Sequence, residues 1–220
     1  MNQRGVSIGA LEATGATGRR CALVSLHAAA LLFGFAGLFG KWLALSAESI
    51  VLGRAMIASA ALAALLRASR RPRGRFEWKF AAGGAILALH WIAFFRAIQN
   101  SSVAVGLLGF ASFPMFVLVV EAIFLHRRLR GADLATIALV TCGLLLLAQE
   151  YRMGNDVVHG LMWGVLSAML FALLTVCNRA SAPRQIPAGV AMWQNAFAAA
   201  CLCRDSRSIR CCRVRASWFS

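Results

Sequence analysis

Charged residues, and acidic ones above all, are scarce in this chain. Only 14% of its 220 residues are charged and eight are acidic, whereas soluble domains average about 25% charged residues. Hydrophobic residues make up 60%, which excludes an ordinary soluble domain. The 23 basic residues give a formal net charge of +15, but they stand in short gaps between apolar runs. This placement is typical of loops at a membrane surface, so nucleic acid is not expected as a partner.

Familiar catalytic and metal-binding motifs are also missing. The chain contains neither H-E-x-x-H nor a phosphate-binding loop, and its few carboxylates do not stand in pairs. Four cysteines near the end form a C-x-C and a C-C pair without a nearby histidine, which is not the usual spacing of a zinc site. We therefore expect no enzyme activity, no cofactor and no metal. A membrane-embedded enzyme in which Arg54, His90 and Glu121 converge stays as the less favoured alternative.

Long apolar runs dominate what is present. A helix needs about 20 mostly apolar residues to cross the hydrocarbon core of a bilayer. Seven runs approach this length, the fifth and the seventh being short: 21–45, 49–66, 80–98, 103–125, 134–149, 157–177 and 189–203. The connectors between them are too short for a soluble domain. The sequence predicts an all-α, polytopic membrane helix bundle of about seven transmembrane helices.

Basic residues in alternate connectors indicate the orientation. They gather in the N-terminal tail and in the second, fourth and sixth gaps, whereas the other gaps have only Lys41, Arg96 and Arg152 in or near them. Lys and Arg concentrate on the cytoplasmic side of membrane proteins. Residues 1–20 are therefore expected to be a cytoplasmic tail. The first run is longer than a typical signal-peptide core and rich in glycine, so we expect it to be retained.

The last segment, 204–220, differs from the rest in composition. A seventh crossing would place its five arginines outside, against the charge bias of the other connectors. Besides the disfavoured zinc site, two interpretations are open. One is an amphipathic surface helix, and the other is a segment not evolved for this fold, as after a shift of reading frame within a longer protein. The second is favoured, and it predicts poor order beyond Arg204.

Two parts of the chain share a pattern. A bulky residue followed by glycine opens each part, at Phe33-Gly34 and Trp163-Gly164, and a basic residue follows the helix, at Lys41 and Arg179. Chance similarity between apolar helix pairs is the alternative. As a repeat, residues 21–149 form a five-helix unit and residues 157–203 form the first two helices of a second. A repeated unit with an odd number of helices must be inverted, as in secondary transporters.

The run from Leu89 to Leu147 resembles the second half of an EamA-type repeat of the drug/metabolite transporter superfamily. It contains an aromatic segment at Phe95–Ile98, a small polar gap, a Ser-Pro element at 111–114 and a glycine before aliphatic residues at Gly143. Arg54 matches an arginine common near the start of the family's second helix. The resemblance implies ten helices in a 5+5 inverted architecture, of which this chain would hold seven. It also implies a multi-pass protein of the cell inner (plasma) membrane.

One position departs from that pattern. Where the family has a Leu-Gly-Glu-Arg-like end to the fourth helix, this chain reads Leu125-His126-Arg127-Arg128, so arginine replaces the glutamate. Glu121, about one and a half turns earlier, is a candidate substitute. We expect Glu121 either to carry a proton or to pair with a basic residue, and pairing is favoured because an unpaired carboxylate is costly in a membrane.

Five polar or aromatic residues are candidates for solute binding or coupling: Arg54, His90, Trp91, Glu121 and Gln194. Arg54 can contact a carboxylate or extend to the membrane surface. His90 can relay a proton or simply pack, and Trp91 can stack on a flat solute. Gln194 would face the cavity in the family arrangement.

Pro114 is a candidate hinge because proline removes a helical hydrogen bond. Gly34, Gly37 and Gly40 are spaced by three and suit close helix packing, or less favourably a solute-lining role. The resemblance to the EamA-type family implies an exporter of small metabolites, such as amino acids, nucleobases or drugs, and we expect it to work by alternating access with optional proton coupling. Truncation is expected to impair it. The alternatives are an inert truncated remnant or a small membrane partner subunit. The expected partners are the lipid bilayer and a solute, and a homodimer is left open.

Overall fold

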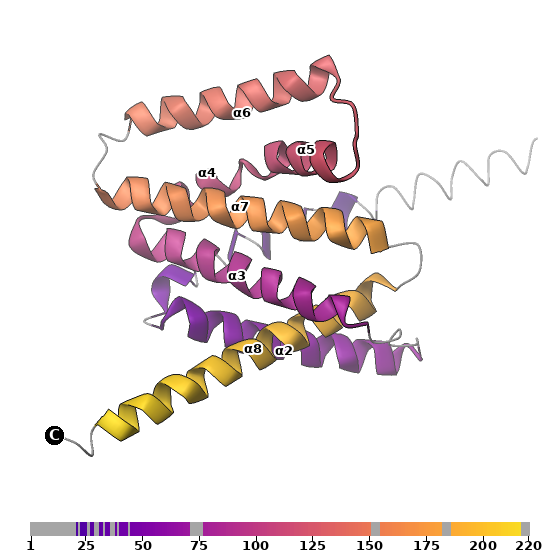
Figure 1. Ribbon diagram of the computed structural model, residues 1–220, viewed down its shortest axis with the longest axis vertical. Coiled ribbons are helices and arrows are strands. Elements are labelled where there is room, and N and C mark those ends of the chain that lie inside the picture. Colours follow the sequence, from indigo (N-terminus) through magenta and orange to yellow (C-terminus); the bar gives the residue numbers. More distant parts are fainter. Residues whose placement is uncertain are drawn as a thin grey trace, which may run out of the picture.

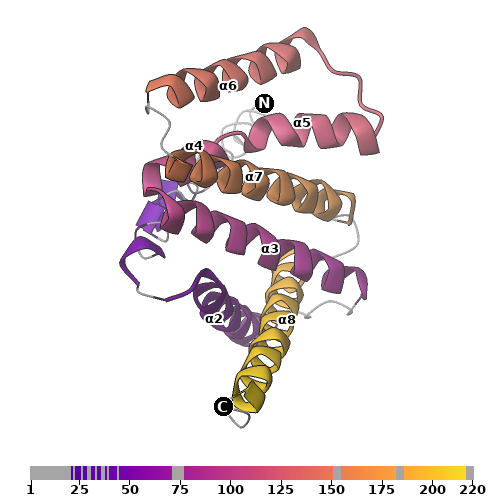
Figure 2. The ribbon, with the colours of Figure 1, turned by 60° about the vertical axis from the view of Figure 1, so that its left-hand side comes forward.

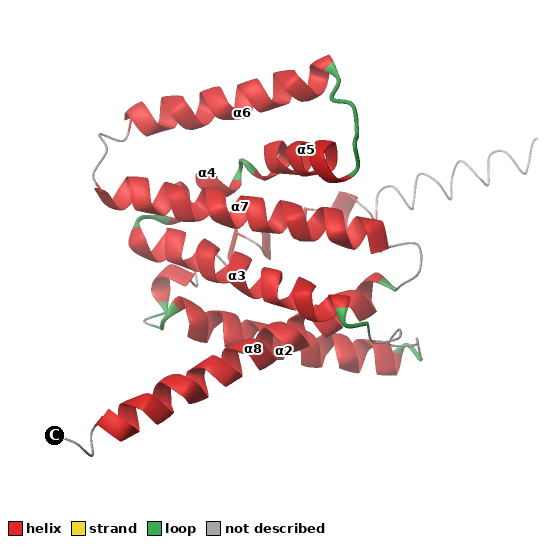
Figure 3. Cartoon of the chain, viewed as in Figure 1, coloured by secondary structure: helices red, strands yellow, loops and turns green. Residues whose placement is uncertain are grey.

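The computed structural model describes most residues between 21 and 43 and the ranges 45–70, 77–150, 155–181 and 186–216, with side chains up to 146, 180 and 204 in the last three. The first described stretch is helical at most of its positions up to Trp42. Seven named helices follow (Figure 1): α2 Ala47–Ala68, α3 Lys79–Asn100, α4 Val103–Phe110, α5 Phe113–Phe124, α6 Gly131–Glu150, α7 Asn155–Ser181 and α8 Pro187–Ala216. The described residues contain no strand, and the predicted all-α bundle is confirmed (Figure 3).

Helix α3 lies at the centre of the bundle. It packs against α7 on one side and against α2 and α8 on the other. The helices α3, α5, α6 and α7 run side by side, whereas α8 crosses α2 obliquely (Figure 2). Helix α6 lies at one edge, and its contacts with α5 are few.

The lengths and surfaces of the helices suit a membrane. Among the described residues, four segments are long and apolar enough to cross a bilayer, namely Ala47–Ala68, Lys79–Asn100, Val103–Phe124 and Asn155–Ala180, and α6 has a shorter apolar part at Gly131–Leu146. Large apolar side chains such as Ile57 and Leu139 are 72% and 75% exposed. Such surfaces are stable when lipid rather than water surrounds them. The protein is a multi-pass membrane protein.

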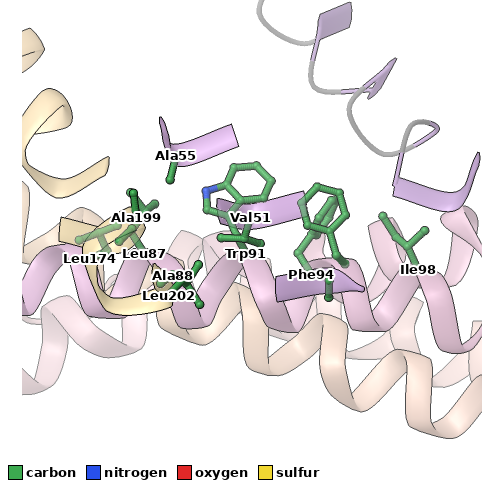
Figure 4. Close-up of a cluster of buried hydrophobic side chains, with 13 residues drawn as sticks. Val51, Ala55, Leu87, Ala88, Trp91, Phe94, Ile98, Leu174, Ala199 and Leu202 are labelled. Carbon is green, nitrogen blue, oxygen red and sulfur yellow. The ribbon is translucent and has the colours of Figure 1, made fainter. Parts of the chain in front are cut away.

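The core joins helices that are far apart in the sequence. Figure 4 shows Val51 and Ala55 of α2 beside Trp91 and Phe94 of α3, with Leu174, Ala199 and Leu202 of α7 and α8 completing the same buried cluster. Phe94 and Ile98 are fully buried. Small residues in this cluster allow the helices to approach closely, which is how membrane helices gain packing energy.

Of the three glycines predicted to form a stripe, Gly40 makes a close contact. A Cβ atom added there would lie 2.5 Å from Cδ1 of Phe95. A Cβ at Gly34 would meet nothing within 4 Å, and Gly34 instead lines a pocket of about 500 Å³ with His27 and Leu31. Gly37 lies outside the described residues.

The span from Val103 to Phe124 is broken into α4 and α5 at Ala111 and Ser112. Pro114 stands in the first turn of α5 and has no N–H to donate to the carbonyl of Phe110, so the regular helical ladder cannot continue. The buried Ser112 hydroxyl donates to the carbonyl of Gly109 at 2.6 Å. Ala111 and Ser112 keep right-handed helical backbone angles, and the role of Pro114 as a hinge stays a prediction.

Polar side chains satisfy the helix ends on the side where α3 ends. Ser46 accepts a hydrogen bond from Ser49 N at 3.3 Å at the start of α2. Lys41 Nζ donates to the carbonyls of Ile98, Gln99 and Ser101 at 3.2, 3.4 and 2.7 Å. A cation at the C-terminal end of a helix satisfies carbonyls that lack intrahelical partners and complements the helix dipole. Lys41 thereby ties the first helical stretch to α3.

At the other end of the sequence, α8 passes through Arg204 and continues to Ala216, and poor order beyond Arg204 stays a prediction. Residues 217–220 lie outside the described residues. The side chains of α8 beyond Arg204 are likewise outside the description.

Candidate functional site

Arg54 and Trp91 meet inside the bundle. Arg54 is the eighth residue of α2, and the carbon of its guanidinium group lies 3.2 Å from the centre of the Trp91 ring on α3. Trp91 is 7% exposed. A cation stacked on a desolvated tryptophan gains about 2 kcal/mol, yet the stack leaves the positive charge uncompensated. Within the part of the chain that the structure describes, no ion pair involves Arg54.

His90 precedes Trp91 and is fully buried. Its Nδ1 lies 2.9 Å from both the carbonyl oxygen and the hydroxyl oxygen of Ser167 on α7. A carbonyl oxygen only accepts hydrogen bonds, so the tautomer that satisfies this contact has its proton on Nδ1. Nε2 is then an acceptor, and it has no hydrogen-bond partner among the described residues. His90 thus presents an unused acceptor deep in the bundle.

Aromatic rings surround this acceptor. The His90 ring stacks on Phe171 with centroids 4.6 Å apart, and its centroid lies 4.9 Å from that of Trp91 and 5.6 Å from that of Phe110. His90 and Trp91 are the twelfth and thirteenth of the 22 residues of α3, near the middle of a helix long enough to cross a bilayer. Arg54, Trp91 and His90 therefore form one continuous cluster, hereafter the midplane cluster.

Glu121 lies elsewhere, at the end of α5, and is 4% exposed. One carboxylate oxygen accepts from Arg127 at 2.5 Å, and the other accepts from Arg179 of α7 at 2.6 Å. Arg127 also reaches Asp133 at 3.3 Å. The hydrogen bond from Arg127 to Glu121 and the charge of Asp133 raise the pKa of Arg127. Glu121 is therefore paired with two arginines, and among the described residues its ion pairs do not involve Arg54 or His90.

A pocket of about 590 Å³ opens beside this ion-pair group. Its lining combines the charged groups Glu121, Arg127 and Arg179 with the apolar side chains of Leu125, Val176 and Ala180. It lies at the membrane side where α5 and α7 end, opposite to the end where Lys41 contacts α3.

Gln194 is 5% exposed and pairs with Asn178 of α7 through two amide hydrogen bonds, Nε2 to Oδ1 at 2.7 Å and Nδ2 to Oε1 at 3.3 Å. Its side chain presses on Gly83 of α3, where an added Cβ would lie 2.5 Å from Nε2. Gln194 therefore lies in the α3–α7–α8 contact rather than in the midplane cluster.

Sequence reasoning missed Ser167 and Asn178 as the partners of His90 and Gln194. The available signal was a polar residue within or at the end of the apolar run 157–177, because a polar group inside a membrane needs a partner. Hydropathy alone does not say which helix supplies that partner. In the described residues, no three His, Cys, Asp or Glu side chains lie close enough to hold a metal ion.

Comparisons with known proteins agree with this architecture. The model of the EamA-like transporter family matches residues 21–149. The uncharacterized transporter YxxF of Bacillus subtilis (strain 168) is 21% identical over 167 residues, which are 72% of this chain and 53% of that protein. The chain thus spans about half the length of this curated relative. One crystal structure, described in words only as that of a protein, aligns with 79% of this chain and with 66% of its own chain. The TM-score is 0.55 and the sequences are 20% identical, so this likeness concerns the fold alone.

Proposed function

The chain belongs to the EamA-like transporter family, and on that premise we propose that it moves small metabolites bearing a carboxylate across the cell inner membrane. The proposed direction is export, by alternating access. Amino acids are the solute class that this chemistry suits best, ahead of uncharged nucleobases. The observation that carries the proposal is Arg54 on the face of Trp91, without an acidic partner among the described residues.

The energetics of Arg54 favour a bound anion. Charged groups inside membrane spans are costly and occur where they serve a pathway or a partner. The stack on Trp91 fixes the guanidinium plane but leaves its N–H groups at the rim able to donate. A carboxylate can accept two parallel hydrogen bonds from such a group. A solute carboxylate would therefore supply the missing negative charge.

His90 gives the midplane cluster a second kind of group. The lone pair of Nε2 can accept a hydrogen bond from a solute N–H or take up a proton. Arg54 would then hold the acidic end of a solute, and His90 would hold a donor group on the same solute. Proton coupling through His90 is the form of energy coupling we propose, whereas Glu121, with both oxygens engaged by arginines, is proposed to be structural.

Movement of the helices completes the mechanism. The break at Ala111 and Ser112, imposed by Pro114, divides the fourth span into two segments that can change their relative angle. We propose that residues 21–149 are one repeat and 157–203 the start of an inverted second one. The N-terminus is proposed to be cytoplasmic, because the basic connectors then all face the cytoplasm. A homodimer through the exposed face of α6 is compatible with this arrangement.

Transport in everted inner-membrane vesicles tests the proposal. Vesicles with and without the chain would be given a ¹⁴C-labelled amino-acid mixture or ¹⁴C-adenine, with an imposed proton gradient. Uptake of amino acids that depends on the chain, and little uptake of adenine, is the expected result. Selective uptake of adenine would refute the role given to Arg54. No uptake of either probe would favour the alternative of an inert remnant or partner subunit.

A further inference from the structure

The two halves of the broken fourth span are held to α7 in different ways. Helix α4 touches α7 backbone to backbone, because an added Cβ at Gly109 would lie 3.0 Å from both Cα of Gly164 and the carbonyl oxygen of Leu161. An added Cβ at Gly164 would in turn lie 2.9 Å from the carbonyl oxygen of Gly106. Because the two backbones touch, α4 has no space to shift relative to α7, and the two helices move as one unit.

Helix α5 packs on α7 through side chains. A cluster of side chains lies between it and α7, in which Val120, Ala172 and Val176 are buried and Phe113, Phe116, Val117 and Leu173 are partly buried. Near its end, Ile123, Phe124 and Leu125 are 63%, 67% and 52% exposed. Few contacts join it to α6 on its other side. A segment that packs on one neighbour through side chains, has few contacts with the other and follows a helix break is suited to local movement.

Ion pairs hold the C-terminal end of α5 in place. His126 adopts a left-handed conformation with φ of 51° and turns the chain back, so that Arg127 N–H donates to the carbonyl of Glu121 at 3.4 Å. The same turn brings the Arg127 side chain to Glu121, while Arg179 reaches that carboxylate from α7. One buried carboxylate thus joins the end of α5 and the end of α7.

We infer that α5 is a gating arm that pivots at Ala111 and Ser112, and that the Arg127–Glu121–Arg179 bridge is the latch that closes its cytoplasmic end. The inference rests on the proposed transport by alternating access. When the latch is closed, the small apolar cluster above it separates the 590 Å³ pocket from the midplane cluster. When the arm swings out, Arg179 leaves Glu121, and the pocket and the midplane cluster become one cytoplasmic path.

The position where the chain departs from the family pattern fits this role. The arginine at 127, where a glutamate stands in the Leu-Gly-Glu-Arg-like pattern, places a cation beside α7, and Arg179 is a second cation on α7 itself. Without Glu121 these two cations would face each other across the seam and repel. Glu121 therefore compensates for the arginine at position 127 and holds the seam together.

Thiol accessibility tests the latch without any solute. Val176, 5% exposed and lining the pocket, would be replaced by cysteine in a background in which all seven native cysteines are serine. Everted vesicles with this variant would be treated with a membrane-impermeant methanethiosulfonate reagent. Glu121→Gln is expected to raise the labelling rate of this cysteine about tenfold, because loss of the latch raises the population of the open arm. Arg179→Gln is expected to do the same. The double variant should be no faster than Glu121→Gln alone, since both changes break one bridge.

Glu48→Gln is the matched control, because it removes one glutamate–arginine pair, with Arg96, at the opposite end of the bundle. It should leave labelling of position 176 unchanged. A second reporter, Val105→Cys near the start of α4 and 1% exposed, lies at the opposite end of the bundle from the latch, so it should stay unlabelled in every variant and separates gate opening from unfolding. Unchanged labelling in Glu121→Gln, or an equal rise in Glu48→Gln, would overturn the latch. Failure of transport in the vesicle assay would leave this labelling result intact, so the two proposals can fail separately.

Discussion

Replacement of Lys41 by methionine should weaken the link between the first helical stretch and α3. Lys41 donates to three carbonyls at the C-terminal end of α3, and the bond to Ser101 at 2.7 Å is the shortest. A hydrogen bond from a charged group contributes about 1.5–3 kcal/mol, and a cation at a helix C-terminus adds about 0.3–1 kcal/mol. The lysine is largely exposed, and two of its contacts are long, so the lower end applies. We expect Lys41→Met to cost about 2 kcal/mol.

Thermal unfolding in detergent, followed by circular dichroism, measures this change. A loss of about 2 kcal/mol corresponds to a melting temperature about 4–8 °C lower for a chain of this size. Lys79→Met is the matched control, because Lys79 is the first residue of the same helix. A cation is unfavourable at a helix N-terminus, so its removal should leave stability unchanged or raise it by about 0.5 kcal/mol. Equal losses in both variants, or no loss in Lys41→Met, would refute the capping role.

Three further substitutions test the fold. His126→Gly should raise stability by about 1 kcal/mol, seen as a higher melting temperature, because His126 has φ of 51°; a lower one would contradict this. Gly109→Val should lower the free energy of unfolding by about 1–3 kcal/mol, because the new side chain would push α4 away from α7. Gly53 has open space around it, so Gly53→Val should lower that free energy far less in the same unfolding assay. Gln194→Leu should cost about 1–3 kcal/mol by leaving Asn178 unpaired in a buried contact; a Gln194→Leu/Asn178→Leu double variant less stable than the single one would argue against that reasoning.

The membrane helices followed closely from hydropathy. The runs 80–98 and 157–177 became α3, Lys79–Asn100, and α7, Asn155–Ser181, because hydropathy finds the part inside hydrocarbon while the helix continues into the polar interface. The break in the fourth span was foreshadowed by Pro114. These predictions depend on residues close together in the sequence, and each helix responds mainly to its own composition.

The contacts within the candidate site could not be predicted in the same way. Lys41 meets carbonyls 57 to 60 residues away, and Arg179 meets Glu121 across 58 residues. In a membrane, the face toward lipid is as apolar as the face toward another helix, so hydropathy does not show which faces meet. The sequence identified Arg54 and His90 as polar residues in apolar runs. That both contact Trp91 became visible only from the packing of α2 on α3.

The effect of Arg54 on transport tests the central claim most directly. Arg96→Gln is the matched comparison, since Arg96 also lies over a tryptophan, Trp163 at 5.3 Å, but already has Glu48 as its partner. In the vesicle assay, Arg54→Gln should lower uptake of the ¹⁴C-labelled amino-acid mixture about tenfold or more, through loss of a charged hydrogen bond to the carboxylate, while Arg96→Gln should retain it. Uptake by Arg54→Gln equal to that of the unmodified chain would contradict the account.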